Sequence, residues 1–270
     1  MVGAAEAFAI FAAGVAAGTV NAVVGSGSLI TFPTLLAFGF PPVVANVSNN
    51  IGVVPGNFSG AWGYRRELAG QRSRLLWLGI FSVLGSIAGA AALLALPAGA
   101  FKLVVPVLIL ASCVLVLLQP RLSARIAARR KRARERAADQ DGAAADNKAD
   151  HADRGGPALA GGMFGAAIYG GYFGAAQGVL VIGLLGTFLD ETMQRINGAK
   201  NVLVGTVNGT AAIVYIIFAH VSWPAVLLIA VGSGIGGLLG ARIGRRLPPL
   251  ALRIFVVVIG LISAVRLIFF

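Results

Sequence analysis

The chain has 270 residues, of which 57% are hydrophobic and only 12% are charged, and its mean hydropathy is +0.85. Because soluble domains carry about 25% charged residues, this composition excludes an ordinary soluble protein and indicates an integral membrane protein. The 37 glycines favour close packing of membrane helices and argue against a β-barrel, whose strands alternate in polarity. The net charge of +12 does not indicate a nucleic-acid partner, because most basic residues lie between apolar segments, where the positive-inside rule places them.

The first half of the chain predicts a broken helical hairpin followed by three membrane spans. The second apolar segment is short and is stopped by Pro41 and Pro42. At 1.5 Å per residue it would be roughly 20 Å long, which is too short to cross the hydrocarbon alone. The expected apolar segments are, in order, residues 4–24, 28–40, 43–63, 75–96 and 100–118.

A strongly basic segment separates the two halves. Residues 121–136 hold eight Lys and Arg against one acid, Glu135. This composition predicts a solvated, partly helical linker without a core of its own. The predicted organisation is an N-terminal transmembrane repeat over 1–118, a basic linker over 119–156 and a C-terminal transmembrane repeat over 157–270.

The second half repeats the plan of the first at an offset of 151 residues. A register held over about a hundred residues indicates duplication, and the repeated glycine pairs predict close helix-packing faces. The matched positions include Asn46/Asn197, Asn50/Asn201, Asn57/Asn208, Gly85/Gly236 and Gly89/Gly240. The expected apolar segments are residues 158–176, 179–189, 198–219, 222–241 and 250–269.

Loop charges predict that the halves are inverted relative to each other. The basic loop of the first half, 65–74, corresponds to the uncharged loop near 220–224, and the uncharged loop at 97–99 corresponds to the basic loop at 242–253. Because Lys and Arg favour the cytoplasmic side, the basic loops and 119–156 are expected in the cytoplasm and both termini outside. The predicted fold class is an all-α integral membrane protein with two inverted repeats, each a broken or re-entrant helical hairpin followed by three transmembrane helices.

The broken hairpins carry the candidate substrate site. Dense amides are costly in an apolar helix without partners, so they are expected to line a site near the middle of the membrane. A helix start offers free N–H groups and partial positive charge to an anion, and glycine lets a ligand approach the backbone; the alternative is that these glycines are only packing notches. The candidate substrate-binding residues are Asn21, Gly25, Ser26, Gly27, Ser28, Asn49, Asn50, Asn57, Gln177, Gly178, Lys200, Asn201 and Asn208.

Lys200 is the most informative single residue of this set. It replaces Asn49 of the first half in a helix that otherwise lacks charge. A buried ammonium predicts an anion site, with snorkelling to the interface or pairing with Asp190 or Glu191 as the alternatives. The connector that holds Asp190, Glu191 and Arg195 is expected at the membrane interface, and a gating or proton-linked role is the second interpretation.

A family resemblance rests on the two broken hairpins. The first reads AGTVNAVVGSGSLITFPTLLAFGFPP and precedes an Asn- and Ser-rich helix, and the second lies near GAAQGVLVIGLLGTFL. This order resembles the TauE/SafE family of sulfite-exporter-type permeases over both halves, with only the basic linker outside it. The resemblance implies a multi-pass protein that moves sulfite, organosulfonates or related small anions across the bacterial inner membrane without ATP. The residues alone indicate an anion carrier, but not sulfur.

Other functions stay open at this point. A passive anion channel, or a carrier for another small anion such as a carboxylate, would use the same features. An intramembrane enzyme or an assembly factor is disfavoured, because no paired nucleophile and base and no Walker A motif is evident. We expect no metal site and no cofactor, while a proton or sodium could serve as coupling ion and a homo-oligomer is allowed. The sequence determines neither the substrate nor the direction of transport.

Overall fold

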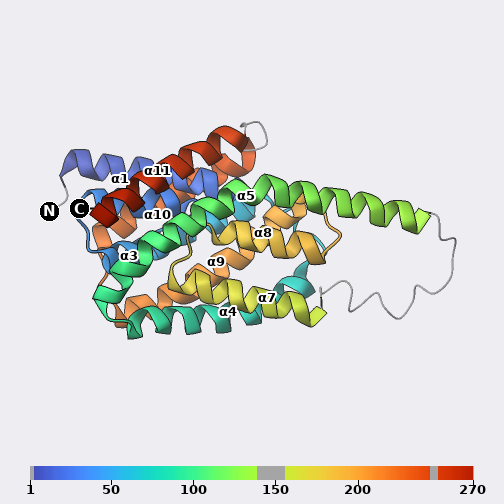
Figure 1. The fold of residues 1–270 in the computed structure, drawn as a ribbon, viewed down its shortest axis with the longest axis horizontal. Coiled ribbons are helices and arrows are strands. Elements are labelled where there is room, and N and C mark those ends of the chain that lie inside the picture. Colours follow the sequence, from blue (N-terminus) through green and yellow to red (C-terminus); the bar gives the residue numbers. More distant parts are fainter. Residues whose placement is uncertain (1–2, 139–155, 244–248, 270) are drawn as a thin grey trace.

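The computed structural model describes residues 3–138, 156–243 and 249–269, which form helices and no strand (Figure 1). The first half contains α1 (Ala4–Val23), α2 (Ser28–Ala37), α3 (Pro42–Gly63), α4 (Arg72–Ala95) and α5 (Ala98–Ala138). The second half contains α7 (Gly156–Tyr172), α8 (Gln177–Phe188), α9 (Met193–Phe218), α10 (Trp223–Ile243) and α11 (Pro249–Phe269). The all-helical class is confirmed, and each half has one short helix in second place, as predicted.

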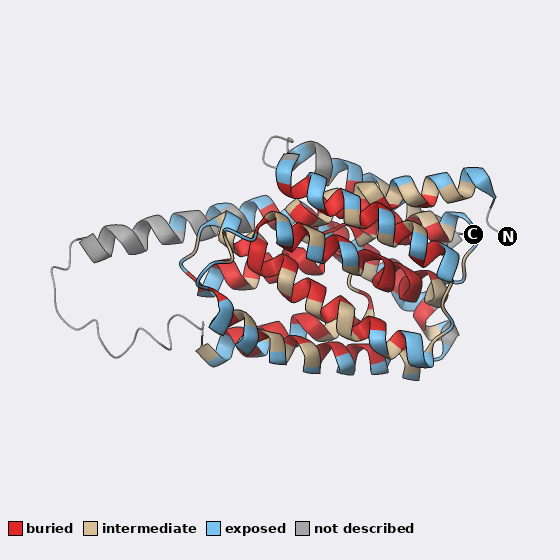
Figure 2. Cartoon of the chain, turned by 180° about the vertical axis from the view of Figure 1, so that it is seen from behind, coloured by how far each residue is buried: buried red, intermediate tan, exposed pale blue. Residues whose placement is uncertain are grey.

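Five of the described helices are long and apolar enough to cross a membrane: α1, α4, part of α5, α9 and most of α10. The short helices α2 and α8 have 10 and 12 residues, which cannot span the hydrocarbon. Helix α3 has 22 residues but carries four Asn side chains, and it is not among the five. Large apolar side chains are exposed along α4, α5, α9, α10 and α11, while buried residues gather along the inner helices (Figure 2). The protein is thus a multi-pass membrane protein.

Local sequence explains the two helix breaks. The chain turns between α1 and α2 at Gly25, with φ of 86°, and between α7 and α8 at Gly174, with φ of 75°. This left-handed backbone favours glycine, and it ends a helix when the glycine N–H bonds back to the last turn. Accordingly, the Gly25 N–H donates to the Val20 carbonyl at 3.2 Å and the Gly174 N–H to the Tyr169 carbonyl at 3.0 Å. Both breaks are therefore glycine-ended helices: the first lies where it was predicted, while the second lies at 173–176, just before the predicted Gln177 and Gly178, which belong to α8.

The fifth helix is longer than predicted. We expected its span to end at residue 118, but α5 continues without interruption to Ala138. The added residues are rich in Ala and Arg, which have high helix propensity, so a polar helix forms where a composition argument expected a largely solvated linker. The expected partial helicity of 119–156 is met over its first part, and residues 139–155 lie outside the described residues.

The closest helix packing joins the two halves of the chain. Helix α4 packs against α7, and α10 packs against α1. A Cβ added at Gly85 or Gly89 would lie within 3.0 Å of the backbone of α7, and one at Gly236 or Gly240 within 3.0 Å of the backbone of α1. The two predicted glycine faces are confirmed, and each of them binds a helix from the other half.

Other contacts also join helices of one half to helices of the other. Helix α3 packs on α10 as α9 packs on α4, and α2 packs on α11 as α8 packs on α5. Helix α3 also contacts α9, and α5 contacts α11. The start of α1 and the end of α11 lie at the same end of the molecule, and α7 runs toward that end while α1 runs away from it (Figure 1). This arrangement brings the two helix breaks and the amide-bearing helices α3 and α9 together.

Candidate functional site

The helix breaks of the two halves are in direct contact. The Gly178 N–H at the start of α8 donates to the Gly25 carbonyl at 3.1 Å. A Cβ added to either glycine would lie within 3.0 Å of the Cα of the other, so a side chain at either position would push the breaks apart. The two breaks therefore come together as predicted, and close packing is one reason for their glycines.

The first N–H groups of α8 are engaged within the protein. The Gln177 N–H donates to the Gly174 carbonyl at 3.2 Å, and the Val179 N–H donates to the Ala176 carbonyl at 3.0 Å. Together with the Gly178 bond, these contacts use the donors of α8 that we expected to face an anion. In this conformation a ligand at the start of α8 would have to replace one of these hydrogen bonds.

Lys200 lies deep in the protein and holds the end of α1. Its side chain is 1% exposed, which excludes snorkelling to the interface. The ammonium donates to the Asn21 carbonyl at 2.6 Å and to the Ala22 carbonyl at 3.2 Å. These carbonyls belong to the last turn of α1, where backbone acceptors lack helical partners and the dipole favours a positive charge. Lys200 thus supplies a fixed cation at the first helix break.

Three of the predicted amide residues surround the same helix end. The Asn21 side chain donates to the Asn57 Oδ1 at 2.5 Å, which joins α1 to α3. The Asn201 amide donates to the Ala22 carbonyl at 3.5 Å, next to Lys200. Residues from α1, α3 and α9 therefore converge here. The repeat pairs Asn57 with Asn208 and Asn201 with Asn50 in sequence. In the structure, Asn57 and Asn201 instead both contact the end of α1.

A second group of amides lies further along α3. The Asn50 amide donates to the Asn208 Oδ1 at 3.3 Å, which joins α3 to α9. Asn49 points elsewhere, because its Oδ1 accepts from the Thr31 hydroxyl of α2. Gln177 points toward α7, where its amide donates to the Ala166 carbonyl at 3.4 Å.

The serines and glycine beside Gly25 complete the predicted set. Ser26 and Gly27 are buried, and Ser28 is partly exposed at the start of α2. A Cβ on Gly27 would meet the Ala17 carbonyl of α1, which supports the packing interpretation for this glycine.

Several buried polar atoms around the breaks have no hydrogen-bond partner. Five of the seven belong to predicted residues: Ser26 Oγ, Asn50 Oδ1, Asn57 Nδ2, Gln177 Oε1 and Asn201 Oδ1, the others being Asn46 Oδ1 and Asn197 Oδ1. Buried polar groups are almost always paired, and an unpaired one costs about 1–3 kcal/mol. Buried atoms of this kind, which include both donors and acceptors, are suited to binding a polar ligand.

Other polar residues that hold the breaks were missed from the sequence. The Ser112 hydroxyl of α5 donates to the Ala175 carbonyl at 3.1 Å, and the Tyr169 hydroxyl donates to the same oxygen. The Gln119 amide of α5 donates to the Val24 carbonyl at 3.3 Å. Helix α5 thus fixes a free carbonyl in both breaks. Isolated polar residues in an apolar segment were the available signal, and nothing local identifies what they touch.

Comparison with known proteins identifies the family of the chain. The family model described as "Sulfite exporter TauE/SafE" matches residues 10–267. The chain belongs to the TauE/SafE family.

Two curated relatives of this TauE/SafE protein are named as membrane transporters. A "Probable membrane transporter protein" of Haemophilus influenzae is 32% identical over 113 residues, which are 42% of this chain and 44% of the relative. A "Probable membrane transporter protein ORF9" of Sinorhizobium sp is 26% identical over 113 residues, 42% of this chain and 43% of the relative. The chain thus spans less than half of each relative in these alignments. No solved structure matches the chain. The family and the names of both relatives denote transporters, not enzymes.

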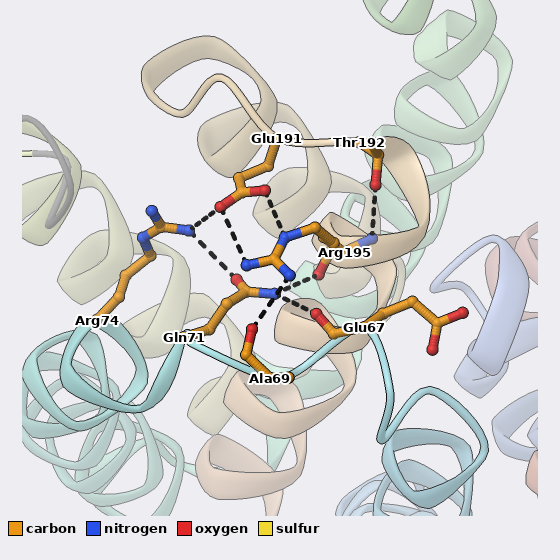
Figure 3. A network of polar contacts seen from close by, with 7 residues as sticks. All are labelled: Glu67, Ala69, Gln71, Arg74, Glu191, Thr192 and Arg195. Atoms are coloured by element: carbon orange, nitrogen blue, oxygen red, sulfur yellow. Dashed lines mark hydrogen bonds and ion pairs between the residues drawn. The ribbon is translucent and has the colours of Figure 1, made fainter.

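An ion-pair network ties the TauE/SafE protein's α8–α9 connector to the start of α4 (Figure 3). The Glu191 carboxylate accepts from Arg195 at 2.5 Å and from Arg74 at 2.9 Å. Arg74 also donates to the Gln71 side chain at 3.2 Å, and Arg195 donates to the Ala69 carbonyl at 3.1 Å. Lys200 is therefore not paired with Glu191. This network would have to open if the connector moved relative to α4.

We expect Glu191→Gln to remove a pH-dependent part of the stability. Burial acts to raise the pKa of the Glu191 carboxyl, but hydrogen bonds from Arg195 and Arg74 and their charges outweigh it, so the pKa lies below its ordinary value. A lowered pKa adds stability that is complete above the ordinary pKa of a glutamate, about 4.3, and is lost as the pH falls through the folded-state pKa. At pH 7 the variant should lose about 1.5–3 kcal/mol. Thermal unfolding in detergent between pH 3 and 7 measures this, and identical pH profiles for both proteins would contradict it.

Two apolar grooves lie on the outer faces of the described helices. One, of about 590 Å³, lies between α4 and α9, and Arg72 and Thr206 are among its lining residues. The other, of about 510 Å³, lies between α5 and α8, and Arg121 and Thr187 are among its lining residues. Neither groove is lined by a predicted site residue. Among the residues that the structure describes, no group of His, Cys, Asp and Glu could hold a metal ion.

Proposed function

We propose that the protein is a secondary transporter that moves a small anion, sulfite or an organosulfonate, across the bacterial inner membrane. The observation that carries this proposal is the fully buried Lys200 ammonium at the end of α1, beside Asn201, whose Oδ1 has no hydrogen-bond partner. A buried ammonium offsets much of the cost of desolvating an anion in a low-dielectric site. Membership of a family named for sulfite export supports the choice of substrate class.

Two features support transport by alternating access. The opposite courses of α1 and α7 (Figure 1) fit two repeats of inverted topology, which transporters use to open a midplane site to either side. The unpaired donors and acceptors belong to both halves. A relative movement of the halves would therefore change the contacts of a bound anion. Of the thirteen residues that the sequence indicated, the proposal relies on Asn21, Asn57, Lys200 and Asn201, which meet at the end of α1.

The test is flux in proteoliposomes that contain the purified full-length chain. We expect saturable uptake of sulfite or a small sulfonate, and counterflow when unlabelled anion is loaded inside. A passive channel would give flux that neither saturates nor supports counterflow. If only carboxylates showed saturable flux, the substrate would be a carboxylate and not a sulfur anion. The absence of any anion flux in folded protein would overturn the proposal.

A further inference from the structure

The amide-bearing helices α3 and α9 present an unusual set of buried oxygens. Asn46 and Asn50 lie one turn apart on α3, and their counterparts Asn197 and Asn201 lie one turn apart on α9. All four Oδ1 atoms are buried and lack a hydrogen-bond partner. Residues at i and i+4 share a helix face. Each helix thus carries a pair of unused acceptors on one side.

The contact of the Asn46 amide fixes which of its side-chain atoms is the oxygen. The Asn46 NH₂ group donates to the Tyr172 carbonyl at 3.0 Å, and the Asn50 NH₂ group donates to the Asn208 Oδ1 at 3.3 Å. The partner of the Asn46 amide is a backbone carbonyl, which can only accept. The Asn46 amide therefore cannot be turned round, and its oxygen must point away from Tyr172. Asn46 and Asn50 are 2% and 4% exposed, so bulk water does not satisfy these oxygens.

Asn46 lies at the end of α7 in the way that Lys200 lies at the end of α1. Tyr172 is the last residue of α7, and Lys200 bonds to the last turn of α1. Both helix ends carry partial negative charge. At α1 the fixed ammonium of Lys200 compensates it. At α7 the residue equivalent to Lys200 is the neutral Asn49, whose oxygen is occupied by Thr31.

The chemistry of the α7 end suits a monovalent metal cation. Amide and carbonyl oxygens are hard ligands, and sodium sites in transporters use helix C-termini and unwound carbonyls. Neutral amides do not take up a proton at physiological pH, which disfavours a proton as the ion at this position. In the described structure Asn46 bonds to a backbone carbonyl, Asn49 to a hydroxyl and Asn50 to an amide. These partners are uncharged, which disfavours a divalent cation.

We propose that two amide oxygens of α3 bind a sodium ion: the Oδ1 of Asn46, which lies beside the C-terminal end of α7, and the Oδ1 of Asn50, one turn further along α3. The ion supplies positive charge near the end of α7, as the Lys200 ammonium does at the end of α1. The inference rests on the proposed transport function, for which it names the coupling ion and its site. The second half of the chain then supplies a covalently fixed cation, the Lys200 ammonium, and the first half binds an exchangeable one, the sodium ion.

The test measures thermal unfolding of the purified full-length chain in detergent, with sodium chloride exchanged for potassium or choline chloride at constant ionic strength. We expect sodium to raise the unfolding midpoint in a saturable way, by about 5–10 °C at a hundred-fold excess over its Kd. Asn50→Leu should raise the half-saturating sodium concentration at least ten-fold. Asn49→Lys should place an ammonium at the α7 end and abolish the sodium response. Gly165→Ala on the exposed face of α7 is the matched control and should respond as the wild type does.

The outcomes separate this inference from the proposed function. Equal midpoints in sodium, potassium and choline, or an unchanged sodium response in Asn50→Leu, would overturn the sodium site. Saturable anion flux in proteoliposomes that does not depend on sodium would also overturn it, while the transport function would stand. Sodium-specific stabilisation that Asn50→Leu weakens would support the site even if no anion flux were found, in which case only the transport function would fall.

Discussion

Replacing Lys200 with Met is expected to weaken anion binding by about 1.5–3 kcal/mol, roughly ten- to a hundred-fold, and to reduce flux accordingly. Met keeps most of the side-chain volume but removes the charge and the donors to Asn21 and Ala22. Lys200→Arg should also impair transport, because the planar guanidinium does not replace a compact ammonium. The first-half counterpart Asn49→Ala removes no charge and should have a smaller effect. The measurements are sulfite- or sulfonate-induced thermal shift and proteoliposome flux.

The structure requires a control for the second role of Lys200. Its ammonium also closes the end of α1, so Lys200→Met should lower stability in the absence of any anion, by about 1–3 kcal/mol for the acceptors left unpaired. Size-exclusion chromatography shows whether the variant is folded. A variant that is less stable but binds and transports the anion as the wild type does would make Lys200 a purely structural residue.

Replacing Gly178 with Ala should destabilise the protein by about 2–3 kcal/mol, the usual cost of overpacking, and should abolish transport. The new methyl group would lie within 3.0 Å of the Gly25 Cα, and backbone cannot move aside as a flexible side chain can. The breaks would have to separate, which would also stretch the hydrogen bond from the Gly178 N–H to the Gly25 carbonyl. Thermal unfolding and proteoliposome flux measure the two effects.

A matched glycine distinguishes this clash from a general effect of substitution. Gly165→Ala, in α7, adds the same methyl group where nothing lies within 4 Å. It should stabilise the helix slightly, since Ala has the higher helix propensity. If Gly178→Ala were as stable and active as Gly165→Ala, the contact between the breaks would not matter to the protein.

The fold was largely predictable because its signals are periodic and local. The offset of 151 residues, the glycine pairs such as Gly85 and Gly89, and the short second segment each follow from spacing alone. The length of α5 was not predictable in the same way. The apolar segment ends near residue 118, but the residues after it still have high helix propensity. The helix therefore continues beyond the apolar segment, to Ala138.

The candidate site was predictable in composition but not in its contacts. Dense amides and helix breaks identified the residues, because such groups are costly in an apolar setting. The partner of Lys200 could not be predicted, since Asn21 lies 179 residues earlier in the chain and offers a backbone carbonyl, which every residue has. The same reason hid Gln119 and Ser112, whose acceptors are also backbone carbonyls.

The glycine face between α1 and α10 has a consequence for biosynthesis. Gly14 and Gly18 of α1 lie against Gly232 and Ser233 of α10, so the partner of the first helix is made more than 200 residues later. At a synthesis rate of about 5–20 residues per second, α1 waits on the order of 10–40 s for it. During that interval its small-residue surface must face lipid or a membrane chaperone. Helix α1 can therefore meet α2 and α3 early, but its packing is complete only after α10 has been made.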